Sequence, residues 1–241
     1  MKATNKPIIL NIETSSNICS VSVSQGIKSI FSLSDSQGQS HAALLSVFIE
    51  QALQLVRQQA SKPDAVAVSA GPGSYTGLRI GVATAKGLCF GFDVPLLSVD
   101  TLQIMFHTAR QQIVNPDSNA LFCPMIDARR MEVYHALYQA DGTTVLPAQA
   151  AIVSADFLAE ILCEKKIYFF GNGSEKCKSI LQSPNCQFID NIFPLSENMC
   201  ELSREQFLIR QFVDIAGFEP LYLKEFRTVK AKNILDKILT D

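Results

Sequence analysis

The first third of the chain carries hydrophobic positions in two different periods. Residues 8–12 are an apolar run, Val21 and Val23 alternate with serines, and residues 29–33 alternate in the same way. Runs of this kind between short polar turns predict a three-stranded meander. Residues 41–59 then carry apolar side chains at the spacing i, i+3, i+4, i+7, which predicts a helix.

The next stretch predicts a parallel crossover unit. Residues 65–70 form a short, continuous apolar run, as expected for a strand buried on both faces. The glycine-rich segment GPGSYTGLRIG, residues 71–81, leads into a helix that should reach about residue 90, and residues 94–99 form another apolar strand. A strand, a helix and a second strand in this order predict parallel pairing.

The second half opens with the pattern of the first. When Ile126 is placed on Ile12, Asp127 falls on Glu13, and both acids stand between an apolar run and an alternating strand. The pattern favours an internal duplication; two unrelated hairpins are the alternative. Further elements are predicted as helices at residues 155–164, 174–182 and 196–214, a strand at 167–170, and a final extended segment with a helix at 231–239.

Composition narrows the class of protein. The 241 residues include 47% hydrophobic residues and a formal net charge of -2, so we expect a folded chain without a global positive field for nucleic acid or anionic lipid. The seven cysteines form no CxxC pair, which favours free thiols in a reducing compartment. Neither a signal peptide nor a membrane span is predicted, so we expect a cytoplasmic protein without membrane contact.

Two acidic hairpins are the main candidates for chemistry. Backbone amides in a turn can face an anion, and a carboxylate beside it can orient a metal or a water. The candidate nucleotide-facing residues are Glu13, Ser15 and Asp127. The second turn carries Arg129 and Arg130 where close approach of a phosphate favours glycine, so nucleotide binding stays an open alternative.

The glycine-rich segment has two interpretations of its own. It lacks the GK[ST] of a Walker A loop, and its glycines do not match GxGxxG. Gly77, Gly81 and Ala85 recur every four residues and would form a smooth helix stripe. That stripe serves either close packing inside the chain or a helix bundle built with a partner.

Other local signals are weak. The three histidines stand at no metal-ligand spacing, so no metal site is predicted, and Ser74 is not in a GxSxG motif. From Lys224 onward basic residues outnumber acidic ones. A solvated tail is the simple interpretation of this segment, and a contribution to RNA backbone contact is the alternative.

Four segments together resemble one known family. They are ILNIETSSNICSVSV (9–23), SAGPGSYTGLRIGVATAKGL (69–88), PLLSVDTLQ (95–103) and CPMIDARRMEVYHALY (123–138). They are similar to the TsaB (YeaZ) family, whose members take part in making threonylcarbamoyladenosine in tRNA. The resemblance implies an α/β, actin-like ATPase fold (ASKHA, ribonuclease H-like) of two duplicated lobes with mixed sheets flanked by helices. We expect the lobes to span residues 1–105 and 106–241, with the last segment packing back on the first lobe.

The resemblance also implies a division of labour. It makes the chain a non-catalytic subunit, a dimerisation platform for the catalytic paralogue TsaD together with the ATPase TsaE, while TsaD transfers the threonylcarbamoyl group to an adenosine beside the anticodon. No cofactor of its own is expected; ATP and metal belong to the partner subunits, and tRNA is contacted indirectly. TsaD-type relatives hold metal with a paired HxxxH, whereas SHAALLSVF here carries only His41.

The resemblance implies partner contacts on the two helices of the first lobe. For the isolated chain, a homodimer formed through these helices and a monomer are both open. The candidate interface residues are His41, Leu45, Phe48, Thr76, Arg79, Val82 and Lys86. Two other hypotheses remain at this point. One is a stand-alone, ATP-binding phosphotransferase of the actin-like fold, and the other is a metallopeptidase.

Overall fold

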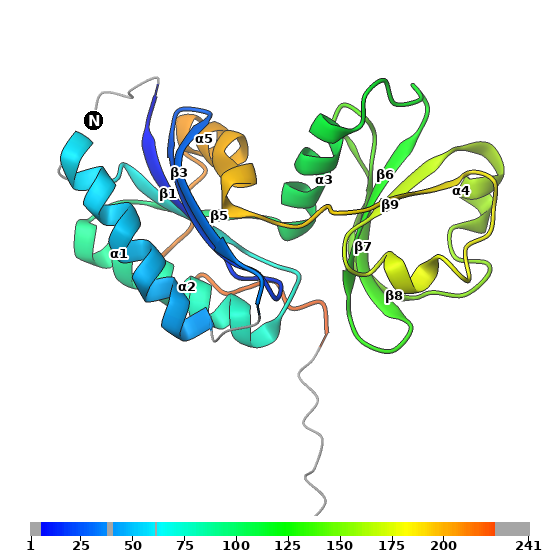
Figure 1. Cartoon of the computed structure of the whole chain (residues 1–241), viewed down its shortest axis with the longest axis horizontal. Coiled ribbons are helices and arrows are strands. Elements are labelled where there is room, and N and C mark those ends of the chain that lie inside the picture. The colour runs from blue at the N-terminus through cyan, green and yellow to red at the C-terminus, as the bar shows by residue number, and fades with distance from the viewer. Residues whose placement is uncertain (1–5, 38–40, 61, 225–241) are drawn as a thin grey trace, which may run out of the picture.

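The chain folds into two lobes that lie side by side (Figure 1). The computed structural model describes residues 6–37, 41–60 and 62–224. Each lobe contains a five-stranded mixed sheet with helices packed on it. The predicted helix at 231–239 lies outside the described residues.

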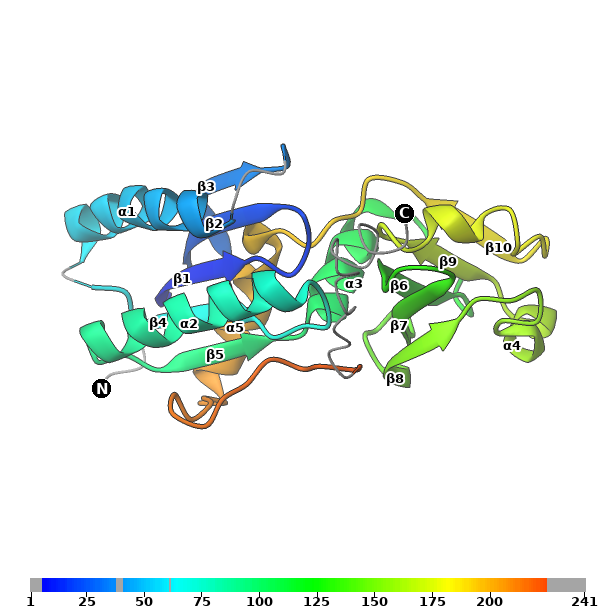
Figure 2. The same cartoon turned by 90° about the horizontal axis from the view of Figure 1, so that it is seen from below.

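The first lobe contains the predicted meander and crossover unit. Its sheet has the order β3-β2-β1-β4-β5, in which β2 is antiparallel to β1 and β3, while β4 and β5 run parallel to β1. Helices α1 and α2 lie on one face of it (Figure 2). The elements are β1 (Ile8–Glu13), β2 (Cys19–Gln25), β3 (Lys28–Asp35), α1 (His41–Gln59), β4 (Ala65–Ser69), α2 (Tyr75–Phe92) and β5 (Leu96–Val99).

Strand alternation explains which face is covered. Leu10, Ile12, Val21 and Val23 are fully buried in one cluster with residues of both helices. Their neighbours in the strands, such as Asn11, point to the opposite face because successive side chains of a strand alternate. Two helices with apolar stripes on an apolar sheet face thus form the core of this lobe.

The second lobe repeats the sheet. Its order, β8-β7-β6-β9-β10, matches that of the first lobe when β6 is placed on β1 and β9 on β4. This equivalence confirms the internal duplication and the expected α/β fold. Its elements are β6 (Leu121–Asp127), β7 (Glu132–Tyr138), β8 (Thr144–Ile152), α4 (Ala159–Glu164), β9 (Ile167–Phe170), the 3₁₀ turn η1 (Glu175–Cys177) and β10 (Cys186–Ile189).

Helix α3 (Thr101–Gln112) connects the lobes and was not predicted. Its N-cap is Asp100, whose Oδ1 accepts hydrogen bonds from the N–H groups of Leu102 and Gln103 at 2.7 and 3.0 Å. The division of the chain at residues 105 and 106 stays a prediction, and this position falls inside α3.

The end of the described chain returns to the first lobe. The 3₁₀ turn η2 (Ser196–Met199) and α5 (Cys200–Leu208) pack on the sheet face opposite α1 and α2 (Figure 1). Residues 213–224, here called the strap, then run along β5 and past the start of α2. Val213 forms an isolated bridge with Leu96, and the Leu221 N–H donates to the Ala70 carbonyl at 2.7 Å.

Three predicted helices are shorter than expected. The helix at 196–214 ends at Leu208, because Arg210 has a left-handed φ of 58° that a right-handed helix cannot continue. The one at 174–182 is a single 3₁₀ turn, and the one at 155–164 begins only at Ala159. Strands β8 and β10 were missed. No helix among the described residues has both the length and the hydrophobicity to cross a bilayer.

Candidate functional site

The glycine-rich segment packs against the turn that follows β1. A Cβ atom on Gly73 would lie 2.3 Å from the Ser15 carbonyl oxygen, and one on Gly77 would lie 2.1 Å from the Thr14 carbonyl oxygen. The Ser74 N–H donates to the Ser15 carbonyl at 2.6 Å. Only glycine allows backbone contact this close, so these glycines join α2 to the β1–β2 turn.

This packing decides between the two interpretations of the small-residue stripe. Gly77, Gly81 and Ala85 all face the interior, and a Cβ on Gly81 would lie 2.2 Å from Thr14 Oγ1. The stripe therefore serves packing inside the chain, and the partner interpretation of these three positions is wrong. A different part of α2 faces outward.

The outward side of α2 has its own small residues. Ala83, Gly87 and Gly91 are exposed, and no heavy atom outside the helix lies within 4 Å of a Cβ built on Gly87 or Gly91. Phe90 stands beside them with its side chain 86% exposed. This flat surface with one projecting aromatic ring was not predicted from the sequence. The signal for it is the four-residue spacing of Ala83, Gly87 and Gly91.

The predicted interface residues fall into three groups. Leu45 and Val82 are buried in the core of the lobe, so their side chains do not reach the surface. Thr76 and Arg79 are exposed, and the Arg79 guanidinium lies 4.7 Å from the centre of the Tyr75 ring. His41, Phe48 and Lys86 are half-buried; Lys86 Nζ donates to the Ala216 carbonyl of the strap at 3.2 Å.

Glu13 lies at the end of β1 but is fully buried. Its Oε1 accepts a hydrogen bond of 2.5 Å from the Ser15 N–H. Burial raises the pKa of this carboxyl to about 6, and the hydrogen bonds from Ser15 offset part of that rise. Its carboxylate serves the shape of the turn, whereas Ser15 faces the space between the lobes.

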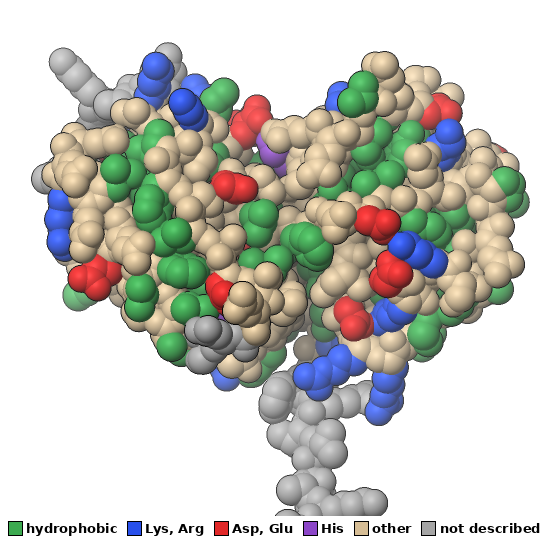
Figure 3. Space-filling model, in the orientation of Figure 1, with side chains coloured by type: hydrophobic (Ala, Val, Ile, Leu, Met, Phe, Trp, Pro, Cys, Tyr) green, Lys and Arg blue, Asp and Glu red, His purple; other side chains and the backbone are tan. Residues whose placement is uncertain are grey.

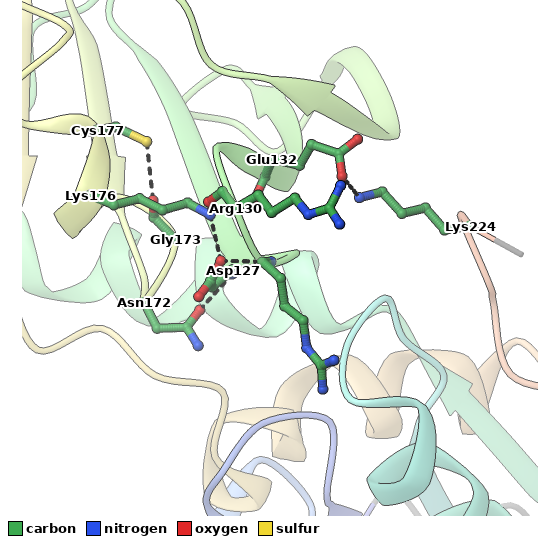
Figure 4. Close-up of polar contacts among 9 residues, drawn as sticks. Asp127, Arg130, Glu132, Asn172, Gly173, Lys176, Cys177 and Lys224 are labelled. Carbon is green, nitrogen blue, oxygen red and sulfur yellow. Dashed lines mark hydrogen bonds and ion pairs between the residues drawn. The ribbon is translucent and has the colours of Figure 1, made fainter. Parts of the chain in front are cut away.

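The second hairpin, residues 127–132, is held by a lysine from a distant segment (Figure 4). Lys176 Nζ donates to Asp127 Oδ1 at 2.5 Å and to the carbonyls of Arg130 and Glu132 at 2.7 Å each. The Asp127 carboxylate also accepts from the Arg129 N–H at 2.9 Å. This hairpin therefore turns carbonyl and carboxylate oxygens inward, around an ammonium group that the chain itself supplies.

That arrangement differs from what a phosphate-binding turn requires. A phosphate is bound by amide N–H groups and a metal ion by carboxylates free to coordinate it. Here Asp127 is already paired with Lys176, and two carbonyls of the turn point at the same ammonium. The hairpin as folded is suited to hold an internal cation.

The loops after β4 and β9 are equivalent. Gly71 and Gly171 have φ values of 98° and 96°, and each is followed by X-Gly-Ser. A Cβ on Gly173 would lie 2.8 Å from the Ile126 carbonyl carbon, as one on Gly73 would crowd Ser15. The sequence contains this repeat, GPGS and GNGS, but it was not recognised there.

A pocket of about 480 Å³ lies where the two hairpins and the two loops meet. It brings together Ser15 and Asp127, two of the three candidate nucleotide-facing residues. The third, Glu13, is buried and does not line the pocket. The strap closes one side of it, since Lys224 pairs with Glu132 of the second lobe. The lining residues are Ser15, Pro72, Gly73, Ser74, Tyr75, Thr76, Ile126, Asp127, Ala128, Arg129, Tyr134, Asn172, Leu221, Tyr222, Leu223 and Lys224.

The histidines lie apart from this pocket. His107 Nε2 is 2.9 Å from Glu201 Oε2, and His135 is buried against Phe157, where desolvation lowers its pKa to about 4. Within residues 6–37, 41–60 and 62–224, no three His, Cys, Asp or Glu side chains are grouped so as to hold a metal ion.

Comparison with known proteins places the chain in a family. Residues 34–216 match the family model TsaD: tRNA N6-adenosine threonylcarbamoyltransferase. The tRNA threonylcarbamoyladenosine biosynthesis protein TsaB of Bacillus subtilis is 32% identical over 66% of this chain and 69% of its own length. The Escherichia coli protein of the same name is 27% identical over 90% of this chain and 94% of its own length.

A solved structure supports the same family assignment. The crystal structure of an uncharacterised Pseudomonas aeruginosa protein, described as similar to the peptidase YeaZ, superposes with a TM-score of 0.74 at 25% identity. The match covers 90% of this chain and all of that one. Sequence and fold together show that the chain belongs to the TsaB (YeaZ) family, within the wider group that the TsaD family model describes.

Proposed function

We propose that this protein takes part in making threonylcarbamoyladenosine in tRNA as a non-catalytic subunit that binds a TsaD-type catalytic paralogue. The names of its relatives in B. subtilis and E. coli support the pathway. The observation that carries the platform role is the outward surface of α1 and α2, here called the helix face. Its exposed residues are Val47 of α1 and Ala83, Gly87, Phe90 and Gly91 of α2, and the strap runs along its border at Ala83 and Lys86.

The helix face combines flatness with exposed apolar area. On α2, the small residues Ala83, Gly87 and Gly91 allow a partner helix backbone to approach closely, and Phe90 provides an aromatic anchor. On α1, Val47 is 47% exposed, and hydrophobic side chains gather over this helix (Figure 3). Large apolar side chains exposed on the surface of a folded protein can mark an interaction site.

The second hairpin supports the non-catalytic assignment. An actin-like phosphotransferase needs a carboxylate to orient its metal ion, and here Asp127 is held in an ion pair by Lys176. The fully buried Glu13 offers no alternative ligand in the pocket. In this proposal, ATP and metal are used by the partner subunits, a TsaD-type transferase and a TsaE-type ATPase, and this chain has no cofactor of its own.

The same surface accounts for the behaviour expected of the isolated chain. Without its paralogue, the helix face would cover itself in a homodimer, since two copies of a related fold present equivalent helices. The paralogue then competes with self-association. Contact with tRNA in this proposal runs chiefly through the partner.

A depletion experiment in the source organism tests the proposal. Loss of this chain should remove threonylcarbamoyladenosine from tRNA, as measured by mass spectrometry of digested tRNA. Re-expression of the wild-type chain or of Val114→Arg should restore it, because Val114 is 81% exposed and lies away from the helix face. Re-expression of Gly87→Arg should fail, since a long side chain there blocks close approach of a partner. Unchanged modification after depletion would refute the proposed function.

A further inference from the structure

The second hairpin carries two arginines with unusual backbone geometry. Arg129 and Arg130 have φ values of 67° and 51°, a left-handed conformation that costs free energy in residues with a side chain. The Lys176 contacts described above hold the hairpin in this shape. As a result, two successive exposed arginines stand in this turn. Arg129 lines the pocket between the lobes, and Arg130 follows it outside the pocket lining.

The charges around these arginines are not balanced. Asp127 and Glu132, the two acids of the hairpin, are paired with Lys176 and Lys224. Within the part of the chain that the structure describes, neither arginine forms an ion pair. The hairpin is thus locally positive on a chain whose net charge is -2. Such a local patch attracts phosphate groups even when the whole molecule does not.

The pocket adds aromatic surface beside Arg129. Lys and Arg side chains, with Asp and Glu side chains just above them, lie beside the point where the described chain ends (Figure 3). The half-buried rings of Tyr75, Tyr134 and Tyr222 line the pocket together with Arg129. Arginines beside aromatic rings in a pocket are suited to an unpaired nucleotide, with its phosphate on the arginine and its base against a ring.

We propose that Arg129 and the tyrosines of the pocket, together with the exposed Arg130 next to them, bind an unpaired nucleotide segment of RNA, with the two guanidinium groups on successive backbone phosphates. The choice of a tRNA loop as the RNA rests on the proposed function. A nucleoside triphosphate fits less well, because the turn points its carbonyls at Lys176 and leaves no free carboxylate for the metal ion that accompanies triphosphate. A chain of singly charged phosphodiesters needs no such metal.

The test is fluorescence anisotropy with a labelled, unmodified anticodon stem-loop RNA. The protein is the assembled complex with the TsaD-type paralogue, and light scattering on each sample verifies assembly. We expect the double variant Arg129→Gln, Arg130→Gln to bind about 10-fold or more weakly, and its slope of log affinity against log salt to fall by about 1.4, or 0.7 per phosphate contact. The charge-conserving variant Arg129→Lys, Arg130→Lys should retain most of the affinity.

The matched control is Lys165→Gln, Lys166→Gln. These lysines stand before β9, at the end of the sheet opposite the pocket, and their loss removes the same charge. An equal fall in affinity for both double variants, or no fall for the arginine variant, would overturn the proposal. So would loss of ADP binding in the arginine variant with stem-loop binding unchanged, since that result assigns the pocket to a free nucleotide.

The design separates this proposal from the proposed function. An arginine variant that assembles with the paralogue and binds RNA like the wild type overturns the RNA contact alone and leaves the platform role standing. A wild-type chain that fails to assemble overturns the platform role. In that case the same titrations on the isolated chain still decide whether the arginines bind RNA.

Discussion

Glu13 shows how one buried carboxyl affects the stability of the whole lobe. Its pKa in the folded chain is raised to about 6 by burial. The folded state therefore holds this proton more tightly than the unfolded chain does. It follows that the free energy of unfolding falls as the pH rises from about 4.5 to about 6, by about 2 kcal/mol in total for this group.

The variant Glu13→Gln tests whether ionisation of the buried Glu13 carboxyl lowers the free energy of unfolding. The amide oxygen can still accept the Ser15 N–H, and no charge is buried. At pH 7.5 we expect the variant to be more stable than the wild type by up to about 2 kcal/mol, and below pH 4.5 we expect the difference to disappear. Urea unfolding at several pH values measures it. A variant that is less stable at pH 7.5 would mean that the carboxylate makes a favourable contact beyond this hydrogen bond.

Lys176 is the second residue whose removal is informative. Its ammonium is held by three acceptors, so Lys176→Met should destabilise the second lobe by about 1–3 kcal/mol, as expected for hydrogen bonds to a charged group. Lys178→Met is the matched control. Lys178 pairs with Glu175 and Asp190, which are both exposed, and its loss should cost under about 1 kcal/mol. If thermal unfolding showed the same loss of stability for both variants, the three contacts of Lys176 would stabilise the chain no more than the exposed ion pairs of Lys178 do.

At the scale of elements, the first lobe was largely predictable and the second was not. The strands and helices from β1 to β5 follow local periodicity, which a single sequence displays. Helix α3 was missed although Asp100, Leu102, Met105 and Ala109 give it a cap and an apolar stripe. Strand β10 is only four residues long, Cys186–Ile189, too short for alternation to distinguish it from a loop.

Helix α2 has two small-residue stripes that should respond to alanine in opposite ways. Gly77→Ala places a Cβ 2.1 Å from the Thr14 carbonyl oxygen and should destabilise the chain by about 1–3 kcal/mol. Gly87→Ala meets no atom within 4 Å and should stabilise it by about 0.5–1 kcal/mol through helix propensity. Denaturant unfolding of both variants measures this. A stabilising Gly77→Ala would contradict the close packing of α2 on the β1–β2 turn.

At the scale of the whole molecule, the sequence predicted the duplication but not that Asp127 in the pocket is held in an ion pair. Asp127 was predicted from its alignment with Glu13, and Ser15 from the turn that follows Glu13; the fold brings both to one pocket. The pairing of Asp127 with Lys176 joins residues 49 positions apart. No local pattern reveals such a contact, and it is this contact that separates a metal-orienting hairpin from one that holds its own cation.

Light scattering behind size-exclusion chromatography tests the central claim, that the helix face binds the paralogue. The samples are this chain, the TsaD-type protein of the same organism, and their mixture. We expect a one-to-one complex for the wild type and for Val114→Arg, and none for Gly87→Arg, although isolated Gly87→Arg should be as stable as the wild type because its added atoms meet no neighbour. A complex that forms equally well with Gly87→Arg would contradict the account.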